Sequence, residues 1–203
     1  MTVEELFQKV VVSYGEETPK TGFFDAVHAI QDYIGRRLWL NSADYLQASF
    51  TTTLAADSHT ILLPSRTLAL VEDEFPWVKE SGSDHTATQL APLPTGMRHR
   101  LTVKGVPRFY EVRNRRLRVF PTPEEDCDIF AEVYRLPDKV AVFAEDLPWD
   151  GMFDDVFVET VKKASQAGSV MTVLPELEAF VYRHVDMVLE HRPLKSVSWR
   201  SSL

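Results

Sequence analysis

The spacing of apolar residues changes twice along the chain, and this change constrains the fold more than any other feature. Near both ends, apolar residues recur every three or four positions, which is typical of amphipathic helices. Between them the spacing falls to two, which is typical of strands with one buried face. The sequence therefore predicts an α+β fold in which helices at both ends bracket a β insertion.

Two pairs of helices are expected, one pair at each end of the chain. The expected helices cover about residues 2–14, 23–38, 153–167 and 176–191. Thr2 and Glu5 have the spacing of a capping box, in which each side chain bonds the backbone N–H of the other residue. We expect residues 1–43 and 141–191 to pack together as a small antiparallel bundle.

Residues 44–140 are expected to form an inserted antiparallel β layer. Its expected strands cover about residues 45–54, 59–63, 68–71, 100–104, 109–113, 116–120 and 128–135. Residues 59–63 are expected to return as a strand after 45–54, because a turn-forming segment separates the two. Residues 79–96 are rich in glycine, proline and serine, so we expect a loop there.

Positive charge is concentrated in two segments of an acidic chain. The net charge is −8, yet residues 97–120 hold eight cations and one acid, and residues 191–203 hold three cations and no acid. Between 109 and 120, apolar residues alternate with arginines, which predicts a hairpin with one apolar and one basic face. Asn114 accepts the positive φ of a tight turn, although Arg115 beside it is not the usual glycine.

The net negative charge of the chain argues against general binding to DNA phosphates. The separation of positive from negative charge indicates an interaction surface instead. The residues expected to form this surface are Arg98, Arg100, Lys104, Arg108, Arg113, Arg115, Arg116, Arg118, Arg192, Lys195, Trp199 and Arg200. Trp199 belongs to an expected extended C-terminal arm, residues 192–203, where no local core is evident. A large indole in this arm needs a pocket, and the nearest candidate for that pocket is another chain. The alternative interpretation is that the C-terminal end is disordered.

The residues that could carry catalysis are not arranged for it. The eight glycines form no phosphate-binding loop, and the six histidines never pair at the spacing of metal ligands. His184 lies on an apolar helical stripe and is expected to be a hydrogen-bonded core residue. Asp150, Asp154 and Asp155 match the preference of acids for a helix N-terminus, and the acids around Cys127 disfavour its thiolate. We therefore expect a non-enzymatic protein without metal or cofactor.

Several segments together resemble the tailed-phage head-to-tail connector adaptors, also called portal adaptors. The motif is Gly105-Val106-Pro107-Arg108-Phe109-Tyr110, followed by a strand at 117–120 and by Pro121-Thr122-Pro123. The further matching segments are the threonine-rich strand 49–53, the return strand 59–65, the strand 129–137 (IFAEVYRLP), Leu147-Pro148 and the paired helices of 153–191. The resemblance covers most of the chain.

The resemblance implies a structural virion protein of the neck, made in the host cytoplasm. Such a protein forms a ring beneath the portal that matches its twelve-fold symmetry, contacts tail or nozzle proteins, and lets genome DNA pass without specific binding. The basic residues would then contact an acidic surface on the next subunit or on the portal. No apolar run approaches the roughly 18 residues of a membrane span, so we expect no membrane contact.

A second class of function stays open at this point. The basic hairpin of residues 97–120 is also compatible with a nucleic-acid-binding module, in which its cations bind phosphates and Phe109 and Tyr110 stack on bases. A salt-dependent gel shift with DNA distinguishes this module from an assembly surface. A hydrolase would need a buried polar cluster, which the sequence does not indicate.

Overall fold

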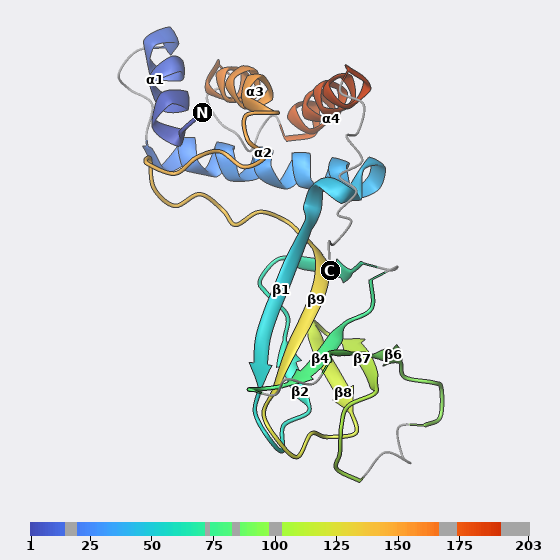
Figure 1. Ribbon diagram of the computed structural model, residues 1–203. Helices are drawn as coiled ribbons and strands as arrows, with labels where there is room; N and C mark the ends of the chain where they lie inside the picture. Colours follow the sequence, from blue (N-terminus) through green and yellow to red (C-terminus); the bar gives the residue numbers. More distant parts are fainter. Residues whose placement is uncertain (15–19, 72–73, 83–85, 98–102, 167–173, 192–203) are drawn as a thin grey trace. The chain divides into compact units, whose positions relative to one another are not determined.

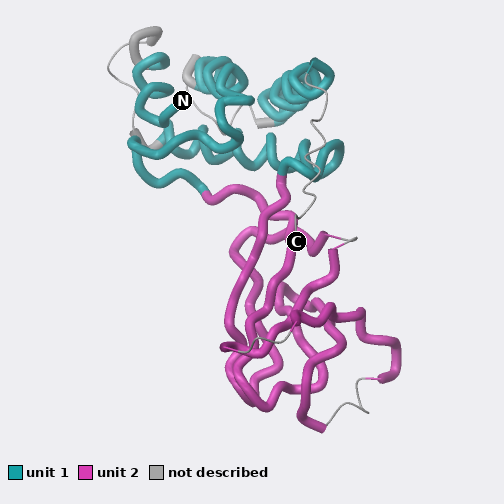
Figure 2. Tube along the Cα trace, in the orientation of Figure 1, with its two compact units in different colours: residues 1–45, 139–203 teal, residues 46–138 magenta. Residues whose placement is uncertain are grey.

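A computed structural model describes residues 1–14, 20–71, 74–82, 86–97, 103–166 and 174–191 (Figure 1). It contains four α-helices and two largely antiparallel sheets, which confirms the α+β class. The chain divides into two compact units, one of residues 1–45 and 139–203 and one of residues 46–138 (Figure 2). The first unit holds the helices and the second holds the strands.

The four helices lie close to their predicted positions. They are α1 (Val3–Tyr14), α2 (Lys20–Asn41), α3 (Asp154–Gln166) and α4 (Leu174–His191). The α2 helix extends beyond the prediction at both ends, and the added C-terminal residues Trp39 and Leu40 are exposed rather than part of its buried stripe. The predicted capping box is confirmed, since the Thr2 N–H donates to Glu5 Oε2 over 3.0 Å and the Glu5 N–H donates to Thr2 Oγ1 over 3.1 Å.

Within the helical unit, α1, α3 and α4 lie along one side of α2 (Figure 1). The packed residues are apolar and aromatic, and the rings of Phe7, Phe23, Phe24 and Phe143 contact one another with centroid distances of 5.0 to 6.0 Å. Phe143 comes from the segment that returns from the strands, so this cluster joins α1 and α2 to the segment before α3. The antiparallel geometry of the bundle stays a prediction.

A charged pair joins α2 to α4. The guanidinium of Arg37 donates two hydrogen bonds to the carboxylate of Asp186, of 2.8 and 2.5 Å, and lies 5.3 Å from the ring centre of Tyr182. The hydrogen bond from Arg37 lowers the pKa of Asp186. Burial, followed by the hydrogen bond to Glu178, raises the pKa of Tyr182 to about 12.

The strands form two sheets in the second unit. They are β1 (Gln47–Leu54), β2 (Thr60–Leu62), β3 (Thr67–Leu70), β4 (Trp77–Glu80), β5 (Thr88–Gln89), β6 (Ala91–Pro92), β7 (Phe109–Arg113), β8 (Arg116–Phe120) and β9 (Cys127–Arg135). The five-stranded sheet has the order β1-β9-β4-β5, and β3 also pairs with β9. The four-stranded sheet has the order β2-β8-β7-β6, in which only β6 and β7 are parallel.

Three sequence predictions for this unit need correction. Residues 59–63 do not pair with the strand before them, because β1 pairs with β9 and β2 pairs with β8 in the other sheet. Residues 79–96 are not simply a loop, because they hold the end of β4 and the short strands β5 and β6. Residues 103–104 lie outside any strand, and the rest of the strand expected at 100–104 falls outside the described residues. Pairing with partners distant in the sequence decides the first two, and local turn signals do not report such pairing.

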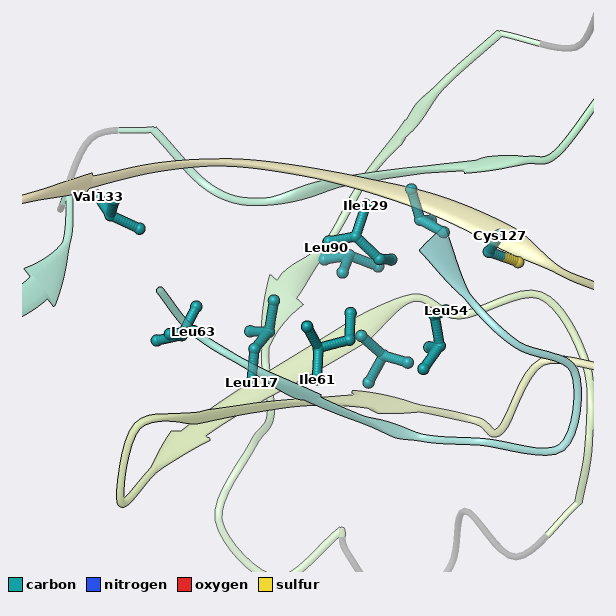
Figure 3. Close-up of a cluster of buried hydrophobic side chains, with 10 residues drawn as sticks. Leu54, Ile61, Leu63, Leu90, Leu117, Cys127, Ile129 and Val133 are labelled. Carbon is teal, nitrogen blue, oxygen red and sulfur yellow. The ribbon is translucent and has the colours of Figure 1, made fainter. Parts of the chain in front are cut away.

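The two sheets enclose one apolar cluster. Its members are Leu54, Ile61, Leu63, Val78, Leu90, Leu117, Val119, Cys127, Ile129 and Val133. In Figure 3, side chains from β9 point toward those from β2 and β8 across the interior. The strands β8 and β9 contribute alternate residues to this cluster, so their intervening side chains point to the outer faces of the sheets.

Candidate assembly surface

The predicted basic hairpin consists of β7 and β8, and a two-residue turn joins them. Asn114 and Arg115 both have positive φ, of 50° and 58°, which is the backbone of the tight turn that matches strand twist. The Arg115 side chain donates to the Pro64 carbonyl over 3.1 Å, and the Leu63 N–H donates to the Arg115 carbonyl over 3.0 Å. The turn is therefore held against the end of β2.

The two faces of the hairpin have opposite character, as the sequence predicts. Leu117 and Val119 of β8 are buried in the core cluster. Arg116 and Arg118 lie on the other face, and β7 places Arg113 directly opposite Arg116. We call the surface formed by Arg113, Arg116 and Arg118 the basic face.

The basic face carries three cations and one acid among the described residues of the hairpin, because Glu111 of β7 lies directly opposite Arg118. Arg113, Arg116 and Arg118 form no ion pair with a described residue. Like charges directly opposite each other on paired strands are destabilising, and Arg113 and Arg116 have this arrangement. The Nε of Arg118 is buried and lacks a hydrogen-bond partner among the described residues, which adds a desolvation cost.

An exposed apolar residue lies beside these arginines. Leu62 of β2 is opposite Arg116 in the sheet and is 66 % exposed. Arginine next to exposed apolar side chains is a combination that protein–protein interfaces favour. Leu62 therefore extends the basic face with an exposed apolar side chain.

The other predicted surface residues are distributed differently. Lys104 is exposed and pairs with Asp57 over 2.5 Å, and the hydrogen bond that its ammonium donates to the Asp57 carboxylate raises the pKa of Lys104. Arg108 is exposed and precedes β7, and Arg115 lies in the turn. The remaining ones fall outside the described residues: Arg98, Arg100, Arg192, Lys195, Trp199 and Arg200. Of the six predicted residues that the structure describes, it brings three together on the basic face.

Sequence reasoning missed an aromatic pair on the outer face of the five-stranded sheet. Trp77 of β4 lies opposite Phe130 of β9, and the two are 42 % and 37 % exposed. The alternation of Phe130 with buried Ile129 and Ala131 was visible in the sequence. The position of Trp77 beside Phe130 was not visible, because the short β4 forms only through pairing with β9.

The structure offers no alternative chemical site among its described residues. No group of three or more His, Cys, Asp or Glu side chains there could hold a metal ion. Cys127 is buried, and burial together with the neighbouring acids raises the pKa of its thiol, as predicted. His184 Nδ1 is hydrogen-bonded to the Phe180 carbonyl over 2.9 Å, in agreement with the prediction of a bonded histidine, although the ring is partly exposed. No described helix has the length and apolar character that a membrane crossing requires.

Comparison with protein families places the chain in a class of phage proteins. The model of the SU10 adaptor protein family matches residues 1–165, and the chain belongs to this family. It is accordingly a phage adaptor protein, a structural component of the virion. The match spans both compact units and ends within α3. No curated protein matches the chain.

Proposed function

We propose that the protein is a head-to-tail connector that forms a ring beneath the portal, joins the capsid to the tail and lets genome DNA pass. Membership of the SU10 adaptor family supports the class of virion adaptor. The observation that carries the finer assignment is the basic face, where Arg113 lies opposite Arg116 and neither forms an ion pair with a described residue. In this proposal it contacts an acidic surface on the next subunit or on the portal.

The physical reason for this contact is charge relief. An arginine opposite another arginine raises the free energy of the isolated subunit, and a carboxylate from a partner lowers it. Exposed ion pairs contribute only about 0.2 to 1 kcal/mol each, so their main effect is on specificity and association rate. A closed ring suits such pairing, because each subunit presents two different surfaces to its neighbours.

The remaining charge is compatible with a conduit for DNA. The chain as a whole has a net charge of −8 although positive charge is concentrated in the hairpin. An acidic channel wall would not hold the phosphate backbone as the genome moves past. Residues 192–203 belong to the same proposal as an arm that becomes ordered in the assembly, with Trp199 buried against another chain.

Charge reversal on the basic face tests the proposal. The variant combining Arg116→Glu with Arg118→Glu should lose ring formation and portal docking at physiological salt, measured by native mass spectrometry of the protein with its portal. The matched control combines Arg36→Glu with Arg183→Glu, which makes the same change in net charge on exposed positions of α2 and α4. If both variants assemble like the unaltered chain, the basic face is not an assembly surface.

The structure weakens the nucleic-acid-binding alternative. Tyr110 is half-buried and packs against the core cluster, and burial raises the pKa of its hydroxyl. It is therefore not a free stacking platform for bases. A gel shift that depends on salt and is lost in the Arg116→Glu, Arg118→Glu variant would restore this alternative.

A further inference from the structure

The outer edge of β1 is open in the described part of the chain. One edge of β1 pairs with β9 at eight consecutive positions, from Gln47 opposite Tyr134 to Leu54 opposite Cys127. On the other edge, β1 is the end of the sheet, and no described residue pairs with it through the backbone. Such an edge presents a row of N–H and C=O groups that another chain can pair with.

This edge lacks the features that protect other strand edges from pairing. The sequence of β1, QASFTTTL, contains no charged residue and no proline. Its register with β9 is continuous, so no bulge turns the edge away. Charged side chains, proline and bulges are the usual means by which proteins prevent unwanted strand addition, and their absence makes β1 a site for an added strand.

The inner face of β1 needs an apolar neighbour. Ala48 and Phe50 are only half-buried and pack against the edge of the core cluster. Residues on an added strand that lie beside them would extend the core and cover the exposed part of the Phe50 ring. A fitting strand therefore carries apolar side chains at alternate positions.

The outer face of β1 has the opposite requirement. Ser49 donates to the Glu132 carboxylate over 2.6 Å, and Thr53 donates to Asp128 over 2.8 Å. Lys79 lies opposite Asp128, but on β4, across β9 from the β1 edge. The face beside the open edge is thus hydroxylic and negative, so an added strand should place hydroxyls or cations there and no acid.

One segment of this chain has that composition. Residues 192–203 hold three cations and no acid, and within them Val197 and Trp199 alternate with Ser196, Ser198 and Arg200. In an extended strand the two apolar residues share one face, and the two serines share the other face with the arginine. Twelve residues span up to about 40 Å when extended, more than the length of an eight-residue strand.

We propose that residues 196–200 of a second copy of the chain add to the open edge of β1 as a strand. Val197 and Trp199 cover Phe50, and Arg200 and the serines lie on the side of Asp128 and Glu132. This inference rests on the proposed ring, because it names a contact between neighbouring subunits. Each subunit both donates and receives a segment, so the contact is head-to-tail and propagates until the ring closes.

Hydrogen exchange of residues 47–54 tests this contact in the full-length protein. With increasing protein concentration, the outward N–H groups of β1 should become protected by about tenfold or more. The variant combining Val197→Ser with Trp199→Ser should lose this protection. The matched control, Ser196→Ala with Ser198→Ala, keeps the apolar residues and should retain it.

A second measurement separates this inference from the proposed function. A synthetic peptide of residues 192–203, added to the full-length Val197→Ser, Trp199→Ser variant, should restore protection of residues 47–54 whether or not a ring forms. Any of three results would overturn the inference. Protection of residues 47–54 could be the same in that variant as in the unaltered chain, it could be independent of protein concentration in the unaltered chain, or the peptide could fail to restore it. A ring that assembles with β1 unprotected would refute this contact and leave the proposed function in place.

Discussion

Replacing Leu117 by alanine should destabilise the β unit far more than the same replacement at its cross-strand partner. Leu117 of β8 is fully buried in the core cluster, whereas Val112, directly opposite on β7, is 41 % exposed. Leu117→Ala removes about three methylene equivalents at about 0.8 kcal/mol each and leaves a cavity, which together cost about 3 to 5 kcal/mol. Val112→Ala removes two methyl groups that are only partly buried, at a cost of about 1 kcal/mol.

Native-state hydrogen exchange of the β8 and β9 amides measures the difference directly. A loss of about 3 kcal/mol corresponds to exchange about a hundredfold faster, because each 1.4 kcal/mol is a factor of ten in the opening equilibrium. Val112→Ala should accelerate exchange by less than about tenfold. Similar effects of the two replacements would show that the two sheets do not share a core at Leu117, and the reasoning would fail.

Two further predictions concern the helical unit. Thr2→Ala removes the Thr2 hydroxyl from the capping box and should destabilise α1 by about 1 kcal/mol. The loss should appear as faster hydrogen exchange of the first-turn amides of α1. Unchanged exchange would show that the cap does not stabilise the helix. Arg37 lowers the pKa of Asp186, so the pair stabilises the folded protein above the ordinary carboxyl pKa of 3.8. This stabilisation is lost as the pH falls through the lowered pKa. Acid titration of exchange in α4 should therefore show a steeper loss of protection in the unaltered protein than in Asp186→Asn, and equal slopes would contradict the pairing.

The sequence predicts the local elements well where each has its own pattern. The helices follow from apolar residues three or four apart, and the hairpin of β7 and β8 has the predicted bounds, because Asn114 and alternating residues specify it locally. The opposite faces of that hairpin follow from the same alternation, since a strand with a period of two separates Leu117 from Arg116.

What the sequence could not predict depends on partners far apart in the chain. β1 and β2 follow each other after a short turn but belong to different sheets, because β9 provides β1 with a continuous eight-residue partner. The strands β4, β5 and β6 are two to four residues long, too short for a periodic signal, and exist through pairing with their neighbours. The open edge of β1 and the Trp77–Phe130 pair are consequences of this long-range order, so local patterns do not indicate them.

The mass of the complex between the protein and its portal tests the central proposal most directly. Native mass spectrometry of the unaltered chain with the portal should show a closed ring with one adaptor for each portal subunit. Charge reversal at Arg116 and Arg118 should abolish this ring, and the control with charge reversal at Arg36 and Arg183 should retain it. An unaltered chain that stays monomeric in the presence of its portal would contradict the account.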